Sequence, residues 1–442
     1  MKTNRRYFIK QTGIATAGLG IASAIPFNSW AQTIPPGNKV NVAIIGCNSM
    51  GFGILKHHLS FPDVNCVAMC DIDDKVLNER SAEIQKTFNQ KPKLYKDFRK
   101  MLEQKDIDAV IIGTPDHWHC LMTVYALQAG KHVYVEKPMA NTIEECNIMV
   151  KAANYYKKTV QVGQQQRSGF IFQKSMELIK SGKIGKLRKV NIWANFNYGV
   201  GGDKIPDSEV PAGVDYDMWL GPAPKRAFNK NRFHGLWRMF WDYGGGLVSD
   251  WGVHLIDMGL WTKDLVKAPE KALVYAGNTY HQNKARETFD SLNASFPKED
   301  FVINYDVIAG IQQGPYGMLY GIAFIGDDGT IVADRSKMTL NPEWDDKAKK
   351  SRTEEYKFDK GEESHKDHVR NFLDCIKSGN KNACPPEIGR AAALHVHIAN
   401  IAGRVGEPAL LWDDVNNRFT NSEAANNLIV PEYRSPWTLP KI

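Results

Sequence analysis

The hydrophobic pattern of the first part of the chain predicts short buried strands that alternate with amphipathic helices. Each strand candidate is a short apolar run, and each helix candidate repeats its apolar positions every three to four residues. Strands that alternate with helices pair in parallel, so this part is expected to form a doubly wound parallel sheet. The expected strands are Val40–Ile45, Val64–Cys70, Ala109–Ile112, Val133–Val135 and Val160–Val162, and the expected helices are 117–129 and 142–156.

After a further expected helix at 170–181, the pattern changes to successive strands without helices between them. Such a run predicts an open, mainly antiparallel sheet, in which Gly326–Gly329 has the composition of a hairpin turn. An open sheet can pair with a second copy, so we expect a homo-oligomer assembled through this sheet. Helical periodicity returns at 364–378 and 388–405. The expected strands are Val190–Ala194, Ala272–Ala276, Asp290–Phe296, Val302–Ala309, Met318–Ile325 and Thr330–Ala333.

The N-terminus has the features of an export signal. Asn4–Lys10 contains a twin-arginine pattern, a weakly apolar run follows at 12–27, and residues 29–31 form a small-x-small cleavage site. A membrane-spanning anchor is the alternative, but the run is short and is interrupted by glycines and Pro26. We therefore expect residues 1–31 to be removed, leaving a periplasmic protein without a stable membrane anchor.

The length of 442 residues predicts more than one domain after this signal. We expect a dinucleotide-binding domain at 38–163 and a substrate and oligomerisation domain at 164–361. The remaining residues, 362–442, are expected to form helices and a tail that pack back on the domain junction.

Charge and cysteine usage exclude several classes of protein. The formal net charge of +7 would fall to +3 without the signal, which carries four basic residues and no acidic one. This mild charge gives no indication of nucleic-acid binding. The seven cysteines contain no C-x-x-C pair, and several lie within apolar strands. They are expected to be buried thiols, not disulfides or metal ligands.

The first strand leads through a turn, Gly46–Gly51, into a helix. This is the setting of a dinucleotide fingerprint, in which a helix N-terminus presents N–H groups to a pyrophosphate. The second fingerprint glycine is replaced by Asn48, which tolerates left-handed backbone angles better than most residues. Asp71 ends the second strand, where a carboxylate binds ribose hydroxyls, although a helix-capping role is the alternative. The neighbouring Asp73 would repel a 2′-phosphate, so NAD is the expected cofactor and NADP is disfavoured.

Polar residues also follow two further strands of the expected sheet. The stretch His132–Met139 passes from a buried strand into Glu136 and Lys137, and the polar loop Gly113–His119 follows the preceding strand. The carboxyl ends of parallel strands border one crevice, so these side chains are expected beside the glycine turn. The alternatives are a solvated lysine at a strand end and a His119 that serves only as a helix residue.

In the second half, Arg232–Tyr243 is dense in aromatic and polar side chains and runs into three glycines. Aromatic faces stack on the CH groups of a sugar ring while polar side chains hydrogen-bond to its hydroxyls, so this segment predicts a carbohydrate site. An aromatic core is the alternative. The candidate substrate-binding residues are Arg167, Arg232, His234, Trp237, Arg238, Asp242 and Tyr243.

Asp250 and His254 are four residues apart in an expected helix with Ser249 as its N-cap. This spacing puts the two side chains on one face, with Asp257 a turn further on. A histidine near a carboxylate can act as a general base close to neutral pH. A structural pair is one alternative, and a metal site is another, although no third and fourth ligand is evident.

Together these motifs resemble the Gfo/Idh/MocA family, named for glucose–fructose oxidoreductase, inositol dehydrogenase and rhizopine catabolism proteins. The resemblance covers nearly the whole mature chain and rests on Thr114-Pro115, Glu136-Lys137-Pro138 and the D-x-x-x-H spacing of Asp250 and His254. Segments 163–168 and 241–246 resemble exported bacterial members in particular.

The resemblance implies an N-terminal Rossmann domain that binds NAD(P), a C-terminal α+β domain with an open sheet, and a lysine and a histidine that act on a substrate hydroxyl. Asn48 departs from the family fingerprint. The candidate cofactor-binding residues are Gly46, Asn48, Ser49, Met50, Gly51, Asp71, Thr114, Pro115, His119, Glu136, Lys137 and Gln165.

The leading hypothesis is hydride exchange at a secondary hydroxyl of a sugar, glycoside or polyol. His254 would take the hydroxyl proton, Lys137 would stabilise the oxygen, and Asp250 would orient the pair. A periplasm supplies no free NAD, so the cofactor is expected to stay bound and to return to its starting oxidation state in the active site.

Two other functions stay open. An NAD-dependent glycoside hydrolase would oxidise, eliminate and re-reduce its substrate, although Asp250–His254 replaces the G-x-L-Y-P-T-H motif of the N-acetylgalactosaminidase branch. The other is a carbohydrate-binding protein without catalysis. A protein that has lost its enzymatic activity should, however, have lost at least one of Lys137, Asp250 and His254.

Overall fold

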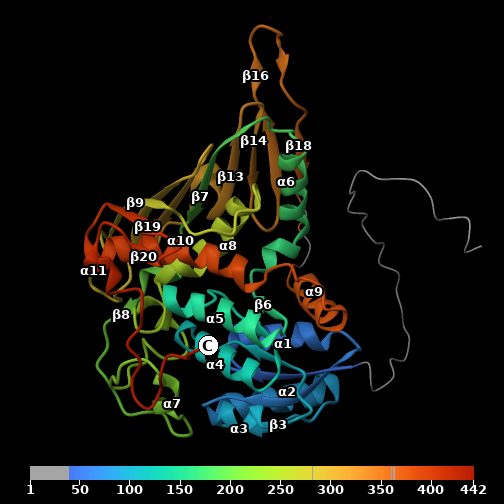
Figure 1. Ribbon diagram of the computed structural model, residues 1–442, viewed down its shortest axis with the longest axis vertical. Coiled ribbons are helices and arrows are strands. Elements are labelled where there is room, and N and C mark those ends of the chain that lie inside the picture. The colour runs from blue at the N-terminus through green and yellow to red at the C-terminus, as the bar shows by residue number, and fades with distance from the viewer. Residues whose placement is uncertain (1–38, 281, 360, 362–363) are drawn as a thin grey trace, which may run out of the picture. The chain divides into compact units, whose positions relative to one another are not determined.

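The computed structural model describes residues 39–280, 282–359, 361 and 364–442, and these contain two large β-sheets of different construction (Figure 1). The expected export signal, residues 1–31, lies outside the described residues. Among the helices of the described part, none is both long and apolar enough to cross a membrane.

The first sheet consists of six parallel strands in the order β3-β2-β1-β4-β5-β6. The direction of strand order reverses between β1 and β4, which places a ligand crevice at the carboxyl ends of these two strands. The strands are β1 (Val40–Ile45), β2 (Val64–Cys70), β3 (Lys93–Tyr95), β4 (Ala109–Ile112), β5 (His132–Val135) and β6 (Val160–Val162). The helices of this part are α1 (Ser49–Leu59), α2 (Asp74–Phe88), α3 (Phe98–Leu102), α4 (His119–Gln128) and α5 (Ile143–Tyr156).

The second sheet has ten strands in the order β18-β15-β14-β13-β7-β12-β11-β9-β19-β20. Among the described strands of this sheet, β7 and β12 pair in parallel and the other neighbours are antiparallel. The strands are β7 (Leu187–Ala194), β9 (Lys271–Gly277), β11 (Ser291–Pro297), β12 (Val302–Ile308), β13 (Tyr320–Gly326), β14 (Gly329–Ala333), β15 (Met338–Pro342), β18 (Tyr356–Phe358), β19 (Ala409–Asp413) and β20 (Arg418–Phe419). Two short pairs stand apart, β8 (Gly202–Asp203) with β10 (Lys284–Ala285) and β16 (Trp344–Asp345) with β17 (Lys350–Ser351).

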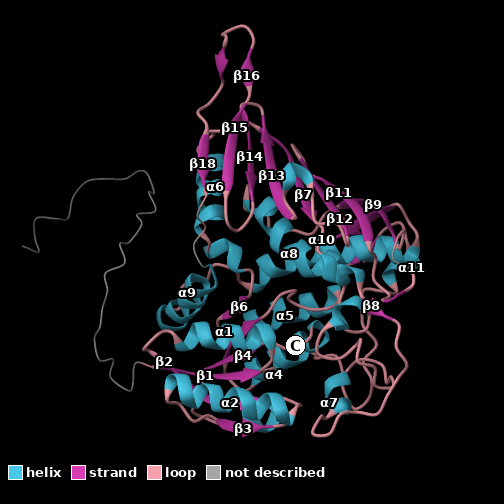
Figure 2. Cartoon of the chain, turned by 180° about the vertical axis from the view of Figure 1, so that it is seen from behind, coloured by secondary structure: helices cyan, strands magenta, loops and turns pink. Residues whose placement is uncertain are grey.

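Helices α8 (Gly246–Trp261) and α10 (Pro386–Val405) form a layer between the two sheets, as Figure 2 shows. Helix α10 packs on α8, on α5 and on β9, and α8 contacts β7 and β12. One continuous hydrophobic core contains residues of both sheets and of these helices. The N-terminal half of α8 is thereby held close to the loops of the first sheet. The other described helices are α6 (Phe170–Lys180), α7 (Tyr216–Leu220), α9 (Ser364–Ser378) and α11 (Glu423–Asn426).

A long stretch that contains α7 and leads to α8 folds around its own aromatic cluster. We call residues 213–243 the aromatic segment. Its cluster includes Trp219, Phe233, Trp237, Phe240 and Tyr243. Part of the predicted carbohydrate surface is therefore a local core, as the alternative interpretation proposed.

The predicted fold class is confirmed, including the hairpin at Gly326–Gly329 that joins β13 to β14. All seven cysteines lie in described residues and are buried free thiols, as predicted. The predicted N-cap at Ser249 is wrong because α8 begins at Gly246, whose φ is +68°, and its N-cap is Gly245. The Ser249 hydroxyl instead donates a hydrogen bond to the Gly246 carbonyl, 3.4 Å away.

Candidate active site

Three glycines hold the loops after β1 and β4 against each other. Gly46 has φ +85°, and a Cβ at Gly51 would lie 2.2 Å from the Gly46 carbonyl oxygen. A Cβ at Gly113 would lie 2.4 Å from the Cα of Gly51. Side chains at these positions would separate the loops, so the glycines keep the turn tight at the N-terminus of α1. This is the geometry in which backbone N–H groups bind a pyrophosphate.

Asn48 does not use its tolerance for left-handed backbone angles. Asn48 is extended with φ −98°, and the left-handed residues of the turn are Gly46 and Ser49, with φ +85° and +43°. The Asn48 Oδ1 accepts a hydrogen bond of 2.9 Å from the Ser49 N–H. An asparagine is accommodated here because its side chain caps α1.

Asp71 is fixed beside this turn. Its carboxylate accepts hydrogen bonds from the N–H groups of Cys47 at 2.7 Å and Asp73 at 3.0 Å. Burial raises the pKa of Asp71, and these N–H groups oppose the rise. The N-cap of α2 is Asp73, not Asp71, so the capping alternative is excluded. The role of Asp71 in binding a ribose stays a prediction.

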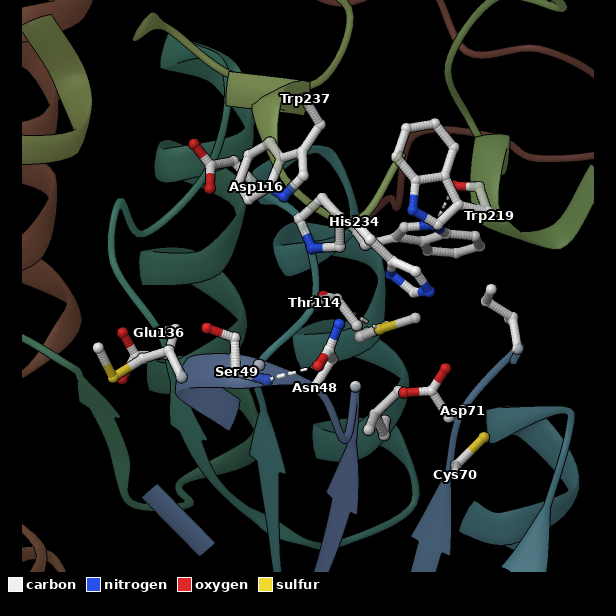
Figure 3. A pocket seen from close by; sticks show the side chains of 18 of the residues that line it. Asn48, Ser49, Cys70, Asp71, Thr114, Asp116, Glu136, Trp219, His234 and Trp237 are labelled. Carbon is white, nitrogen blue, oxygen red and sulfur yellow. Dashed lines mark hydrogen bonds between the residues drawn. The ribbon is translucent and has the colours of Figure 1, made fainter. Parts of the chain in front are cut away.

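These groups border a cavity of about 290 Å³ at the carboxyl ends of the first sheet. Figure 3 shows Asp71 on one side of this cavity and Asp116 and Glu136 on the other, with Asn48 and Ser49 between them. The cavity therefore runs from the ribose position toward Glu136 and its neighbour Lys137. The predicted site residues that line it are Gly46, Asn48, Ser49, Met50, Asp71, Thr114, Pro115, Glu136, Lys137, His234, Trp237 and Arg238.

Lys137 reaches from the end of β5 to helix α8. Its Nζ lies 2.6 Å from Oδ1 of Asp250 and also donates to the Asp250 carbonyl oxygen at 3.0 Å. Arg238 donates to the same Oδ1 at 3.1 Å, and the Tyr198 hydroxyl donates to Oδ2. Burial alone would raise the pKa of Asp250, but the charges of Lys137 and Arg238 lower it below its usual range. Asp250 is therefore an ionised carboxylate that holds two cations.

His254 lies one turn further along α8 and is buried. Within the described residues its Nδ1 has no hydrogen-bond partner. Burial and the charge of Arg335 lower the pKa of His254 well below its ordinary value. This differs from the expected histidine poised near neutral pH, because the carboxylate of Asp250 is engaged by other partners. His254 is a neutral imidazole in this setting, and its catalytic role stays a prediction.

Two carboxyl groups line the Lys137 end of the cavity. Burial raises the pKa of Glu136 to about 7, against the opposing charge of Lys137. A Cβ at Gly163 would lie 2.6 Å from Glu136 Oε1, so the absence of a side chain at Gly163 makes room for this group. Burial also raises the pKa of Asp116 well above its usual range. Both groups therefore retain a proton to higher pH than an exposed carboxyl would.

The aromatic segment supplies a further wall of the cavity. Trp219, His234 and Trp237 line it (Figure 3). Nε2 of His234 lies 2.8 Å from Oδ2 of Asp73. The guanidinium of Arg238 lies over the Trp237 ring, 4.1 Å from the ring centroid. The same segment thus contacts both the ribose end and the Lys137 end.

Backbone hydrogen bonds fasten the aromatic segment to the first sheet. The Asp74 N–H donates to the Gly213 carbonyl, and the Asp215 N–H donates to the Ile72 carbonyl, each over 3.0 Å. The Trp118 indole N–H donates to the Trp219 carbonyl at 3.0 Å. A cofactor in the cavity would therefore be enclosed between the sheet and this segment.

Several predicted site residues are not part of the cavity lining. Arg167 forms a buried two-point ion pair with Asp257, with contacts of 2.7 and 2.9 Å. Asp242 pairs with Arg226, and Tyr243 is fully buried in the aromatic cluster. Gly51, Arg232, Gln165, Asp250 and His254 also lie outside the lining. The binding roles proposed for these residues stay predictions.

His119 lies behind the cavity wall and connects two loops. Its Nδ1 is 2.7 Å from the Pro138 carbonyl oxygen, and its Nε2 is 2.9 Å from the Thr114 carbonyl oxygen. Burial lowers the pKa of His119 to about 4, so the neutral ring donates to one carbonyl at a time. The ring positions Thr114 and the Lys137–Pro138 loop relative to each other.

Sequence reasoning does not single out four residues that contribute to the site, namely Gly113, Asp116, Tyr198 and Trp219. The sequence could have indicated Asp116, because this residue directly follows Thr114-Pro115 after a strand end. The sequence could also have indicated Gly113, because this glycine directly follows β4. Tyr198 and Trp219 come from distant loops, and no periodic pattern marks them.

Family models match both parts of this architecture. The model described as an oxidoreductase family with an NAD-binding Rossmann fold matches residues 40–164. The model of the family's C-terminal alpha/beta domain matches residues 171–287 and 355–439. The chain belongs to the Gfo/Idh/MocA family. This Gfo/Idh/MocA protein therefore has the NAD-binding Rossmann domain that the glycine turn and Asp71 predicted.

Among curated relatives, a glycosyl hydrolase family 109 protein of Shewanella pealeana is 30% identical over 205 residues, which is 42% of this chain and 45% of that protein. A protein of the same description from Shewanella baltica is 31% identical over 203 residues, covering 42% and 44% of the two chains. The matches thus span less than half of the length of these relatives.

Solved structures share the fold at lower identity. The myo-inositol 2-dehydrogenase of Lactobacillus plantarum has a TM-score of 0.61 and 19% identity, covering 85% of this chain and 100% of that one. The aldose-aldose oxidoreductase of Caulobacter crescentus has a TM-score of 0.62 and 18% identity, with coverage of 85% and 100%. The WlbA dehydrogenase of Bordetella pertussis, crystallised with NADH and UDP-GlcNAcA, has a TM-score of 0.61 and 17% identity, with coverage of 85% and 99%.

Proposed function

We propose that this protein exchanges a hydride with a secondary hydroxyl of a sugar, glycoside or polyol, using retained NAD. The observation that carries the proposal is Lys137, which lines the cavity and whose Nζ lies 2.6 Å from Oδ1 of Asp250 behind it. In the proposed function, this cation, held by an ionised carboxylate, meets the substrate oxygen beside the reactive end of the cofactor. The sugar and polyol dehydrogenases among the structural neighbours support the same class of substrate.

The residues of the cavity fit NAD. The glycine cradle leaves the space that phosphate groups need, Asp71 is fixed for the ribose hydroxyls, and Asp73 disfavours a 2′-phosphate. Lys96 Nζ, which also lines the cavity, is bonded to Asp74 Oδ1 at 2.7 Å. When bound, NAD supplies the acceptor and the donor of the hydride.

Side chains of the protein transfer the hydroxyl proton and stabilise the charge on the substrate oxygen. The ammonium group of Lys137 stabilises negative charge that develops on the substrate oxygen. His254, a neutral imidazole, accepts the hydroxyl proton and later returns it. Asp250 orients Lys137 and Arg238 and stays ionised throughout.

Substitution of two residues tests these roles. Lys137→Ala and His254→Ala are each expected to lower the rate of cofactor reduction by sugars about 100- to 10,000-fold. The amount of NAD(H) released by denaturing the purified protein should stay unchanged, because neither side chain builds the glycine cradle. Near-normal turnover in both variants would overturn the assignment.

Retention of the cofactor is supported by the aromatic segment, which is hydrogen-bonded to the sheet at both ends of the cavity. Protein purified without added nucleotide should release close to one equivalent of NAD(H) on denaturation. Absence of bound nucleotide, together with normal folding, would instead favour a carbohydrate-binding protein without catalysis.

A redox-neutral glycoside hydrolase is the second candidate. It is favoured by the carboxyl group of Asp116, which hydride exchange alone does not use, and by the similarity to glycosyl hydrolase family 109 proteins over 42% of the chain. Incubation with nitrophenyl glycosides without added cofactor separates the candidates. Release of nitrophenol supports hydrolysis, whereas reduction of the bound cofactor that a second sugar reverses supports hydride exchange between sugars.

We further propose that residues 1–31 direct export through the twin-arginine pathway. The support is the sequence Asn4–Lys10 with the small-x-small site at 29–31. Replacing Arg5 and Arg6 together by lysine should abolish export while leaving the folded protein in the cytoplasm. Cell fractionation measures this outcome, and unchanged export would contradict the proposal.

We also propose that the protein forms a homo-oligomer through its second sheet. Leu273, Tyr275, Ile308 and Leu411 share one face of β9, β12 and β19 by strand register and are exposed. Exposed apolar side chains on a sheet face favour association, although polar residues of β11 and β12 lie between these four. Light scattering should detect an oligomer, and Leu273→Lys with Tyr275→Lys should reduce its mass. A monomer in both proteins would contradict the proposal.

A further inference from the structure

Asp116 occupies a fixed position at the end of β4. It begins a short 3-10 helix, Asp116–Trp118, immediately after Pro115. The next two side chains anchor this helix: His117 Nε2 and Trp118 Nε1 lie 3.1 and 3.0 Å from the carbonyl oxygen of Trp219. The backbone of Asp116 is therefore held between the first sheet and the aromatic segment.

The carboxyl group of Asp116 lines the cavity and is 3% exposed. Within the described residues it has no hydrogen bond or ion pair, unlike Asp250, which has three partners. A Cβ at Gly244 would lie 3.2 Å from Oδ2 of Asp116, so the glycine leaves space beside this oxygen. A buried carboxyl that the protein leaves unpaired at a cavity surface is available to a ligand.

The charged groups near Asp116 come from several elements. Arg238 of the aromatic segment and Lys137 after β5 favour the ionised form of Asp116, while Asp250 of α8 and Glu145 of α5 disfavour it. Figure 3 shows Asp116 beside Trp237, on the same side of the cavity as Glu136. The carboxyl thus lies at the end of the cavity where the substrate would react.

We propose that Asp116 is a further catalytic residue, which carries a proton between two neighbouring atoms of a glycoside substrate. One atom is the carbon next to the substrate carbonyl, and the other is the departing glycosidic oxygen. This inference rests on the proposed function, because removal of a hydride from the hydroxyl-bearing carbon creates the carbonyl that makes the neighbouring C–H acidic.

The step balances within the substrate and one side chain. The carboxylate of Asp116 takes the proton from C2, and the electron pair of that C–H bond forms a C1–C2 double bond conjugated with the C3 carbonyl. The C1–O bond breaks, its electron pair stays on the departing oxygen, and Asp116 gives that oxygen the same proton. Water then adds to C1 by the reverse route, with Asp116 moving one water proton to C2. The later return of the hydride to C3 leaves hydrolysis as the net reaction.

Burial supports this role because it raises the pKa of Asp116. A carboxyl with a raised pKa is a stronger base when ionised, and it holds the proton between the two transfers. One carboxyl must reach both atoms from one face of the ring. The substrate is therefore a glycoside whose departing oxygen and C2 hydrogen are cis, as in a β-glucoside and not in an α-glucoside.

The experiment uses the protein with its retained cofactor and a panel of nitrophenyl α- and β-glycosides in D₂O. For the wild-type protein, we expect nitrophenol release from β-glucoside-type substrates, with deuterium at C2 of the released sugar by NMR. Asp116→Asn should lower both signals about 100- to 10,000-fold. Reduction of the bound cofactor, followed at 340 nm, should fall far less than nitrophenol release, because removal of the hydride precedes the step assigned to Asp116.

The outcomes distinguish this inference from the proposed function. If no sugar alters the 340 nm absorbance of bound NAD(H) in the wild-type protein, the proposed function fails. If the cofactor is reduced but no deuterium enters C2 and no nitrophenol appears, the function stands and the role of Asp116 is overturned. Wild-type rates of nitrophenol release by Asp116→Asn also overturn it. The NAD(H) content and melting temperature of the variant show that the cavity is intact.

Discussion

Lys137 Nζ lies 2.6 Å from Asp250 Oδ1, and the two side chains are 11% and 10% exposed. The lysine lies in the loop after β5 of the first sheet, whereas the aspartate belongs to α8, which packs on β7 and β12 of the second sheet. Because each carries a charge that burial disfavours, each stabilises the other only in the assembled two-domain fold.

Asp250→Asn tests the contribution of this pair to stability. The substitution leaves Lys137 and Arg238 without their shared carboxylate, so we expect the free energy of unfolding to fall by about 3 kcal/mol. Urea unfolding monitored by tryptophan fluorescence measures the change. The control is Asp264→Asn, which removes an exposed partner of Lys180 and should cost less than about 1 kcal/mol. Equal losses in the two variants would contradict the prediction.

Gly51→Ala and Gly53→Ala form a matched pair two residues apart in α1. A Cβ at Gly51 meets the Gly46 carbonyl oxygen at 2.2 Å, whereas a Cβ at Gly53 has no neighbour within 4 Å. We expect Gly51→Ala to destabilise the protein by about 1–3 kcal/mol and to lose NAD. Gly53→Ala should stabilise it by up to about 1 kcal/mol because alanine favours a helix. Retention of NAD by Gly51→Ala would show that the cradle is not required.

His234→Ala is expected to loosen the retained cofactor. The ring lines the cavity and its Nε2 contacts Asp73 Oδ2 at 2.8 Å, so its loss opens the ribose end. The exchange of bound NAD for added labelled NAD should accelerate by about 10-fold, the equivalent of one lost hydrogen bond to a charged group. Lys284→Ala, which removes the surface contact with Asp203, serves as the control and should leave exchange unchanged. Exchange at the same rate in both variants would exclude the aromatic segment as the retaining element.

The substitution Glu145→Gln is expected to change how the free energy of unfolding depends on pH. Glu145 is 1% exposed and accepts hydrogen bonds from the hydroxyls of Tyr433 and Thr142, and burial raises its pKa to about 7 from 4.5. Between these pH values the folded protein binds a proton that the unfolded chain does not. Stability therefore falls as pH rises through this interval and is not recovered above it.

The variant lacks this proton, so its free energy of unfolding should rise relative to the wild type by about 3 kcal/mol between pH 4.5 and pH 7. Urea unfolding at a series of pH values measures the difference. Glu79→Gln, at an exposed position of α2, should give a constant difference. A pH-independent difference for Glu145→Gln would mean that Glu145 is ionised in the folded protein throughout this interval.

The sequence by itself determined the features that depend on local pattern. Strand and helix periodicity gave the class of both sheets, and the positions of Gly46, Asp71 and Lys137 at strand ends placed them at one crevice. This works because the carboxyl ends of parallel strands must share an edge of the sheet, whatever the rest of the chain does.

Only the tertiary structure decided which groups pair. Asp250 was expected to orient His254, four residues away, yet its carboxylate meets Lys137, Tyr198 and Arg238 instead. Arg167 was expected to meet the substrate and is bound to Asp257. A buried charged group pairs with an opposite charge that lies nearby in the folded protein. Packing brings together residues that are far apart in the chain, so the sequence does not show which charges will pair. For the same reason, the availability of the Asp116 carboxyl, which the described partners leave free, is visible only in the folded protein.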